Sequence, residues 1–292
     1  MFWWWMLARY GTPYRGSKSR IAEWVVENLP PADTVVDLFA GGCAVAHAAV
    51  LSGKFERFIV NDISDAPKLF IDAVNGKYAD ESRVPTREEF HTLKDSDPYI
   101  RYVFSFGNNG KDYLWSRDLE PVKVAASKMI ASPTLNERYK AYHDFVRALQ
   151  PYLTRRSLNE IEGLQRLQGL ERLQRLQGLQ GLQGLERLQG LQLDYREAEL
   201  PDNATVYCDP PYRGTKCGCY GGFDHDAFDE WLASCGRLVV VSEYTAPRGC
   251  IEVARRERHC TASANGKSQV AIERLFVHGS HLDEYNELMR RP

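Results

Sequence analysis

The chain lacks the two patterns by which a zinc protein or a membrane protein is recognised from its sequence. Seven cysteines are present, but no CxxC pair occurs, and the CGC at Cys217–Cys219 has no second pair at zinc-site spacing. No apolar run is long enough to span a membrane, and the apolar start MFWWWML is too short for a secretory signal. We therefore expect reduced thiols, no metal, no membrane partner and a cytoplasmic location.

Charge of one sign is also scarce, because the formal net charge is only −2 over 292 residues. Global charge therefore does not indicate a nucleic-acid partner. The charge is nevertheless uneven, since residues 101–156 carry ten Lys or Arg against five Asp or Glu. A basic segment in an acidic chain is typical of either a phosphate-facing surface or a solvated helical face, and charge alone favours the second.

The sequence does contain an alternation of helix and strand patterns. Ser17 or Ser19 can cap a helix that carries Ile21 on its apolar face and ends at Pro30. Apolar, β-branched runs predict strands in TVVDLFAGG, RFIVNDI, ATVYCDPPY, RLVVVSEY and VAIERLFVH, with helices in CAVAHAAVLSG and DHDAFDEWLASCG. Strand, glycine turn, helix and strand in succession form one βαβ unit, so we expect an α/β fold with a doubly wound sheet.

A long central region separates the second of these strands from the third. Residues 65–160 mix helix and loop patterns and are rich in aromatic and basic side chains, and residues 161–193 hold a repeat of leucine triplets. We therefore expect one α/β core, formed by residues 1–64 and 194–292, that is interrupted by both segments.

The repeat places a leucine at every third position from Leu164 to Leu191. An α-helix needs a period of 3.6 and a strand a period of 2, while 3₁₀ helices rarely exceed about four residues. Six glycines weaken any helix further, by roughly 1 kcal/mol each relative to alanine. We interpret the repeat as an insertion that forms a helical or solenoidal projection with buried leucines, and a disordered tract is the open alternative.

The motif DPPY follows the third strand and combines a carboxylate with an aromatic face. Pro210 and Pro211 would hold a stiff turn at the carboxyl end of the strand, where α/β sheets place their sites. An exocyclic amine on a heteroaromatic ring is a poor nucleophile, because its lone pair is delocalised. Hydrogen bonds to Asp209 and to the Pro210 carbonyl would localise that lone pair while Tyr212 stacks on the ring. The alternative is a proline pair that merely ends a strand.

Three further motifs are less specific when taken alone. The glycines of DLFAGG would let a ligand approach the backbone, and Asp62 ends a strand where acidic residues accept ribose hydroxyls. PYRGSK adds an aromatic ring, a glycine and Lys18. Each motif also has an ordinary structural interpretation, as a common turn, a solvated aspartate and a basic loop.

Together and in this order, PYRGSK, DLFAGG, VNDI and DPPY resemble the motifs of the Dam-type DNA adenine (N6) methyltransferases, with details seen in phage and prophage members. The resemblance covers most of the chain except the triplets and the first residues. It implies a Rossmann-like sheet that binds S-adenosylmethionine. It also implies that residues 65–160 form a helical DNA target-recognition insertion and that residues 161–193 are a second, repeat insertion.

The resemblance also assigns cofactor-binding roles to matching residues. Tyr14 and Lys18 would line the S-adenosylmethionine pocket, and Asp62 would bind the ribose hydroxyls. Phe39 and Gly41 would lie beside the methionine portion of the cofactor.

The same resemblance makes Asp209, Pro210 and Tyr212 the catalytic residues, with Asp209 also in contact with the cofactor. Cys43 departs from the family pattern, which has a glycine there, and this puts the detailed pose of the cofactor in doubt. No cysteine nucleophile is needed because an amine attacks, so Cys208 is better interpreted as a buried strand residue.

Double-stranded DNA is the implied partner. A base inside a duplex cannot reach a pocket, so the adenine would be flipped out at a cost of roughly a few kcal/mol and methylated by direct displacement. We expect the basic segment to offset that cost through phosphate contacts. The candidates for these contacts are Arg101, Lys111, Arg117 and Lys128. A bacterial or phage-encoded enzyme, alone or within a restriction–modification system, is the expected setting.

Two other readings of the motifs stay open at this point. Cytosine N4 and protein glutamine methyltransferases use a similar Pro-Pro-Tyr turn, although the aspartate and the large central region favour adenine. A non-catalytic DNA-binding or scaffold protein would instead make the triplets the working part, and the apparently complete set of motifs argues against it. The recognition sequence and the oligomeric state are not specified by the sequence.

Overall fold

The computed structural model describes residues 10–153, 167–180, 184–214, 222–260 and 269–290. The chain divides into two compact units, which we name by their content. The sheet unit comprises residues Met1–Gly11, Ser17–Pro67 and Gly184–Pro292, and the helical unit comprises Thr12–Gly16 and Lys68–Gln183.

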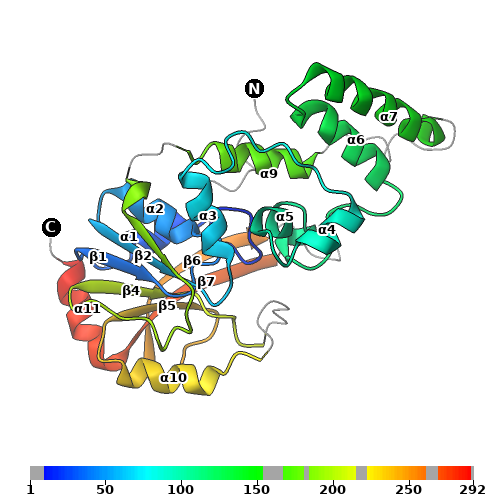
Figure 1. Ribbon diagram of the computed structural model, residues 1–292. Helices are drawn as coiled ribbons and strands as arrows, with labels where there is room; N and C mark the ends of the chain where they lie inside the picture. Colours follow the sequence, from blue (N-terminus) through cyan, green and yellow to red (C-terminus); the bar gives the residue numbers. More distant parts are fainter. Residues whose placement is uncertain (1–9, 154–166, 181–183, 215–221, 261–268, 291–292) are drawn as a thin grey trace. The chain divides into compact units, whose positions relative to one another are not determined.

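The sheet unit is built on a seven-stranded sheet with the order β3-β2-β1-β4-β5-β7-β6 (Figure 1). The first five strands in this order are parallel, whereas β7 runs antiparallel to both β5 and β6. The strands are β1 (Thr34–Asp37), β2 (Arg57–Asn61), β3 (Leu188–Leu191), β4 (Ala204–Cys208), β5 (Val239–Glu243), β6 (Cys250–Cys260) and β7 (Gln269–His278). The chain order reverses between β1 and β4, so the α/β, Rossmann-like class predicted from the sequence is confirmed.

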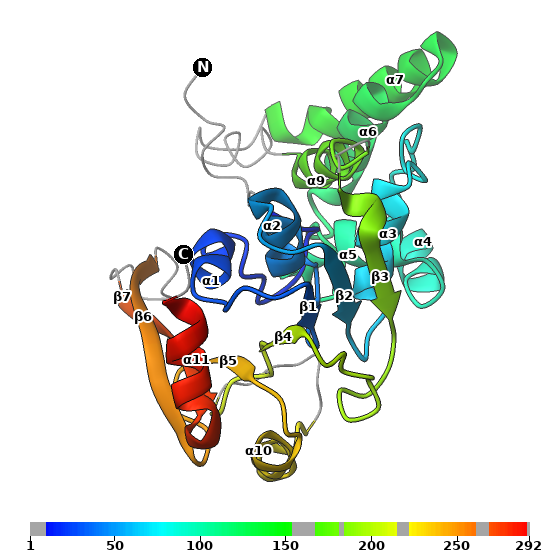
Figure 2. The same ribbon diagram turned by 90° about the vertical axis from the view of Figure 1, so that its left-hand side faces the viewer.

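Helices cover both faces of this sheet. Figures 1 and 2 show α1 and α2 against one face and α10 against the other. The helices of the sheet unit are α1 (Ala22–Glu27), α2 (Ala44–Ser52), α10 (His225–Ser234) and α11 (Leu282–Met289), with 3₁₀ turns η3 (Leu185–Arg187) and η4 (Gly279–His281). Because both faces are covered, β1 and β5 are buried at every position, including the polar residues at their ends.

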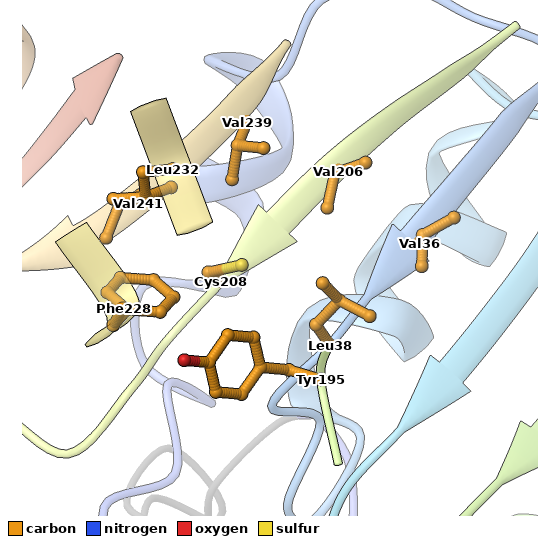
Figure 3. Close-up of a cluster of buried hydrophobic side chains, with 9 residues drawn as sticks. All are labelled: Val36, Leu38, Tyr195, Val206, Cys208, Phe228, Leu232, Val239 and Val241. Atoms are coloured by element: carbon orange, nitrogen blue, oxygen red, sulfur yellow. The ribbon is translucent and has the colours of Figure 1, made fainter. Parts of the chain in front are cut away.

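One core layer lies between α10 and the central strands (Figure 3). Phe228 and Leu232 of α10 pack over valines from β1, β4 and β5, and Tyr195 joins them. Cys208 is fully buried in this layer, so its interpretation as a structural strand residue is confirmed. The cluster comprises Val36, Leu38, Tyr195, Val206, Cys208, Phe228, Leu232, Val239 and Val241.

The start of α1 differs from the prediction. The helix begins at Ala22 behind Ile21, which provides no side-chain cap. Ser19 instead accepts a hydrogen bond from the backbone N–H of Tyr10 at 2.7 Å, and Ser17 accepts from the N–H of Ser19. Ser19 is therefore occupied by the backbone of Tyr10, and neither serine caps α1.

The helical unit contains α4 (Arg87–Leu93), α5 (Pro98–Val103), η2 (Phe106–Asn108), α6 (Glu120–Ala131), α7 (Leu135–Leu153) and α9 (Gln168–Gln177), while α3 (Ala66–Val74) begins at the unit boundary. Its core is aromatic. Tyr99, Phe104 and Trp115 are buried and pack edge to face, and Tyr113 links them to Phe90. The aromatic residues of the predicted recognition region are therefore largely structural.

The leucine repeat does not form one separate insertion. Its first described part forms α9 in the helical unit, and its last part forms η3 and β3 in the sheet unit. Strand β3 pairs in parallel with β2, with Leu188 opposite Phe58 and Leu191 opposite Asn61. The core therefore resumes at Gly184, ten residues before the predicted position of 194, because the sheet completes its edge with repeat sequence. Residues 161–166 and 181–183 of the repeat lie outside the described residues.

Within the described ranges, no helix combines the length and the apolar character needed to cross a membrane.

Candidate active site

A glycine turn connects β1 to α2 at the carboxyl edge of the sheet. The N–H of Leu38 bonds to the Tyr207 carbonyl of β4 at 3.0 Å, and the N–H of Ala40 bonds to the Asn61 carbonyl of β2 at 2.9 Å. These bonds tie the turn to both neighbouring strands. Gly41 has a φ of 46°, in the left-handed region that glycine enters without strain. The turn predicted from DLFAGG therefore exists at its predicted place.

Cys43 ends this turn and precedes the first residue of α2. Its backbone is left-handed, with φ 56° and ψ 34°, which is uncommon for a residue with a side chain. The side chain is fully buried, and burial raises the pKa of its thiol well above the usual range, with further increases from Asp37 and Asp62. The turn therefore accommodates the departure from the family pattern by burying a neutral thiol.

Asp62 lies directly after β2 and fixes the same turn. Its Oδ2 accepts the N–H of Gly41 at 2.9 Å, and its Oδ1 accepts the N–H and the hydroxyl of Ser64 at 2.8 and 2.7 Å. The residue is buried, at 1% exposure. The structure thus places the predicted ribose-binding carboxylate beside the predicted glycine turn. The carboxylate accepts hydrogen bonds from backbone N–H groups of the turn and of the residues that follow β2.

A cavity of about 370 Å³ lies in the sheet unit, lined by residues that follow β1, β2 and β3. Its walls are largely apolar and aromatic. Phe39 lines this cavity, whereas Gly41 and Asp62 are not among its lining residues. The lining residues are Leu38, Phe39, Ile63, Leu193, Asp194, Tyr195, Arg196, Gly222, Phe223, Asp224 and Ala227.

Asn61 organises the strand ends around this cavity. Its side-chain amide donates to the carbonyls of Leu38 and Leu193 at 3.2 and 3.0 Å, and its oxygen accepts the N–H of Leu193 at 3.0 Å. One buried amide therefore joins the ends of β1, β2 and β3. Sequence reasoning missed this role, although Asn61 directly precedes Asp62 in VNDI.

Sequence reasoning also missed Asp194 and Tyr195, which line the cavity after β3. Their signal was the carboxylate and aromatic residue of LDY at the end of the repeat, a pair that also follows strand β4 in DPPY. The triplets concealed it because the last strand-forming residues were counted as repeat.

The DPPY turn places its carboxylate beside Lys18. The Lys18 ammonium lies 2.7 Å from both carboxylate oxygens of Asp209, and the two side chains are only 9% and 17% exposed. The same ammonium lies 4.5 Å from the centre of the Tyr212 ring. Lys18, predicted to line the cofactor pocket, therefore contacts the two residues predicted to hold the target amine.

The hydroxyl of Tyr212 is anchored at the opposite end of its ring. It lies 2.8 Å from Ser242 Oγ of β5 and donates to Glu273 Oε2 of β7 at 3.1 Å. Tyr244 packs against the ring edge, with centroids 4.4 Å apart. These contacts fix the plane of the aromatic ring on strands that are remote from it in sequence, and neither partner was predicted.

Burial dominates the electrostatics of this cluster. It raises the pKa of the Asp209 carboxyl, and the adjacent Lys18 opposes that rise. The pKa of Asp37 is raised well above its ordinary value by burial and then by Asp209 and Asp62. One oxygen of Asp37 also has no hydrogen-bond partner among the described residues. The site is therefore an acidic cluster that favours a cationic or hydrogen-bond-donating ligand.

Tyr14 falls in the helical unit, where its ring packs against that of Tyr102 at 5.8 Å. The structure therefore groups it apart from Lys18, although both come from PYRGSK. Its predicted cofactor contact stays a prediction.

The four predicted DNA contacts all belong to the helical unit but lie on successive segments. Arg101 on α5 is partly buried, and its Nε donates to the Lys94 carbonyl at 2.6 Å. Lys111 lies on the loop after α5 and Arg117 lies before α6, and both are exposed. Lys128 on α6 lines a second cavity, of about 420 Å³, within this unit. Lys111 and Arg117 are thus the most accessible of the four.

Within the described residues, no group of three or more His, Cys, Asp or Glu side chains is arranged to hold a metal ion. Cys43, Cys208, Cys235 and Cys250 are free thiols, whereas Cys217 and Cys219 lie outside the described residues.

Comparison with known proteins gives one family and a more distant likeness of fold. A family model described as D12 class N6 adenine-specific DNA methyltransferase matches residues 14–159, half of the chain. A crystal structure from Pyrococcus horikoshii, of a provisionally assigned RNA methyltransferase, has 8% identity and a TM-score of 0.37. That alignment covers 90% of this chain and 86% of the other. No curated protein matches the chain significantly.

Proposed function

The chain belongs to the D12 class of N6 adenine-specific DNA methyltransferases, and from this premise we propose that Asp209, Pro210 and Tyr212 hold the target amine during transfer. The enzyme methylates the N6 amine of adenine in DNA. The observation that carries the residue assignment is the largely buried Asp209 carboxylate, which shares one ammonium with the Tyr212 ring. This pair lies at the carboxyl end of β4, beside the reversal of the strand order.

The cavity of the sheet unit fits S-adenosylmethionine, the methyl donor that the family implies. Ile63 and Tyr195 give it apolar and aromatic walls that suit a purine ring, Phe39 is available to the methionine portion, and Asp194 adds a carboxylate. The unpartnered oxygen of Asp37 suits an ammonium group, which would also favour the ionised form of that carboxyl. Bound S-adenosylmethionine supplies a methyl group on positively charged sulfur.

The residues of the DPPY turn act on the amine. Asp209 accepts one amine N–H and the Pro210 carbonyl accepts the other, which turns the nitrogen lone pair out of conjugation with the ring. Tyr212 stacks on the adenine, and Ser242 and Glu273 hold its plane through the hydroxyl. The nitrogen would gain one bond to the methyl carbon as the methyl–sulfur bond breaks and its electron pair stays on sulfur. The nitrogen also loses one proton, and Asp209 is the adjacent acceptor for that proton.

Lys18 occupies the place that the amine needs. Its ammonium is a donor that lies between the carboxylate and the aromatic face, as the amine of a stacked adenine would. We expect Lys18 to keep Asp209 ionised before DNA binds and to release at least one carboxylate oxygen when the adenine enters.

Duplex DNA is the substrate form that we propose, with the adenine flipped into the site. The exposed cations Lys111 and Arg117, with Arg101 and Lys128, would contact phosphates and offset the cost of flipping. Affinity for DNA should then fall steeply with salt, and an affinity that is independent of salt would remove this role from the four residues.

Asp209→Ala tests the catalytic assignment with tritium-labelled S-adenosylmethionine and adenine-containing duplex DNA. We expect methyl transfer to be abolished while the fold is kept. Tyr212→Ala should be severely impaired, and Tyr212→Phe much less so, because phenylalanine keeps the stacking face.

Asp202→Ala is the matched control, since this aspartate precedes β4 and its side chain is 95% exposed. It should retain the turnover of the unchanged enzyme. Substantial methyl transfer by Asp209→Ala would overturn the assignment.

A phage or prophage origin and partnership with a restriction enzyme are proposals that rest on the motif resemblance, and a cytoplasmic location is a proposal that rests on the cysteine pattern. A restriction-endonuclease gene beside the coding sequence would support the partnership, and phage structural genes there would support the origin.

A further inference from the structure

Arg172, supplied by the leucine repeat, bonds to the carboxyl end of α5. Its Nη1 donates to the carbonyls of Val103 and Ser105 at 2.6 and 2.9 Å. Val103 is the last residue of α5, and the last carbonyls of a helix lack partners within the helix. A guanidinium there satisfies them and complements the partial negative charge of the helix end. The repeat therefore caps a helix of the predicted recognition region.

Gly169, three residues earlier in α9, lets this contact form. A Cβ built at Gly169 would lie 2.7 Å from Cε1 of Phe104, so any side chain would collide with that ring. Phe104 lies between the two carbonyls that Arg172 binds. One Gly-x-x-Arg pair of the repeat thus contacts all three residues from Val103 to Ser105.

The segment from Val103 to Ser105 leads into a short loop. Ser105 pairs with Tyr113 as an isolated antiparallel bridge, and the Ser105 hydroxyl accepts the N–H of Gly110 at 3.0 Å. The loop between them carries Lys111, and α5 carries Arg101. Both cations proposed to contact phosphates here are therefore attached to the backbone that Arg172 holds.

Buried leucines make α9 a fixed support. Leu170, Leu173 and Leu176 are between 0% and 6% exposed. The Gln177 amide also donates to the carbonyls of Ala79 and Glu81 at 3.0 and 3.3 Å. Burial lowers the pKa of Arg172 to about 10, which leaves the guanidinium charged at neutral pH. The contact therefore joins two firmly packed elements.

We propose that Arg172 is a positioning residue for DNA recognition, through which the repeat helix α9 holds α5 and the loop from Ser105 to Tyr113 in the arrangement that binds DNA. This inference rests on the proposed function of the helical unit in DNA binding. It assigns to one register of the repeat a role in choosing the methylated site.

The test compares Arg172→Met with Arg172→Lys and with Arg175→Met. Arg175 is the matched control because it lies on the same helix and burial lowers its pKa to the same value of about 10. Each variant is assayed for the KM for duplex DNA, kcat at saturating DNA, S-adenosylmethionine affinity, and the distribution of methyladenine over a randomised DNA library.

For Arg172→Met we expect a KM for DNA raised about ten-fold and a broadened site preference, because two charge-assisted hydrogen bonds are lost. Cofactor affinity and kcat should be unchanged. Arg172→Lys should raise the KM and broaden the site preference less than Arg172→Met, since an ammonium can still donate to these carbonyls. Arg175→Met should keep the KM and the site preference of the unchanged enzyme.

Unchanged DNA KM and site preference in Arg172→Met would overturn the inference, and so would equal losses in Arg172→Met and Arg175→Met. If Arg172→Met does not fold, Arg172→Lys provides the test. Its single ammonium replaces only part of the guanidinium contact, so the site preference should still shift while cofactor affinity is unchanged. A site preference equal to that of the unchanged enzyme would overturn the inference. Failure of the proposed DNA-binding function of the helical unit has a different signature, namely an affinity of the unchanged enzyme for DNA that does not fall with salt.

Discussion

Residues Gln168–Gln177 and residues Leu188–Leu191 come from the same triplet repeat, yet the first segment is helix α9 and the second is strand β3. The helix buries its leucines in the helical unit, whereas the strand completes the edge of the sheet beside β2. Nearly identical local sequence therefore adopts two secondary structures. The neighbours that each segment packs against select between them, since propensity is only a weak prior.

A period of three is compatible with both structures only over short lengths. In a helix each third residue lags by about 60°, so Leu170, Leu173 and Leu176 of α9 span roughly a third of the circumference. In a strand an odd spacing sends Leu188 and Leu191 to opposite faces, and both are half-buried. Both elements are short, since α9 has ten residues and β3 has four.

Proline substitutions in α9 and β3 should show the largest difference in stability between the two segments. Proline at any of residues 171–175 should cost about 3 kcal/mol or more, because it removes a helical hydrogen bond and collides with the preceding turn. At residues 188–191 the cost should alternate, because only every second N–H of an edge strand faces its neighbour. The measurement is the free energy of unfolding from chemical denaturation.

The two patterns serve as controls for each other, since both come from the same repeat in the same protein. A uniform loss across residues 188–191, or a tolerant position within residues 171–175, would contradict the assignment of strand and helix.

The elements that could be predicted from sequence are those with an unambiguous apolar period. The runs that became β1, β2, β4, β5 and β7 were recognised, as were the runs that became α2 and α10. Strand β6 was missed because CIEVARRERHC is highly charged, which reflects its position at the sheet edge. Strand β3 was missed because a period of three hides the alternation of a strand.

The candidate site divides in the same way. Asp209, Lys18 and Tyr212 could be named from motifs, and the structure brings their side chains together. The supports of the site could not be named, because they come from distant strands. Glu273 reaches Tyr212 from β7, and Asn61 binds the backbone that follows β3. Such pairings depend on sheet order, which no local pattern encodes.

Alanine substitutions at two glycines in and directly after α9 should have different effects on stability. Gly169→Ala should destabilise the protein by about 1–3 kcal/mol, because the new methyl group would overlap the Phe104 ring. Gly178→Ala should be neutral or stabilise by roughly 0.5–1 kcal/mol, because its φ of −71° suits alanine and a Cβ would meet only atoms 3.5 Å away. Thermal and chemical denaturation of both variants provide the measurement. Equal effects would mean that glycines in the repeat are interchangeable, as its sequence alone implies.

The smallest expected effect is a pH dependence of stability that arises from the Lys123 ammonium, which interacts with Glu171 of α9. Lys123 of α6 is 2% exposed, and burial lowers its pKa to about 8, while Glu171 of α9 opposes that shift. In the unfolded chain a lysine keeps its proton up to about pH 10.4. Between these values the unfolded state binds more protons, so stability should rise as pH increases from 8 towards 10.

Lys123→Met should abolish that rise, and Glu171→Gln should make it begin at a lower pH, because removing the carboxylate lowers the pKa of Lys123 further. The midpoints of chemical denaturation measured from pH 7 to 10 test both variants against the unchanged protein, so that thiols and tyrosines which titrate in the same range cancel. Parallel pH profiles for the three proteins would show that α9 does not set the charge state of Lys123. The helical part of the repeat would then act on its unit through packing and the Arg172 contact alone.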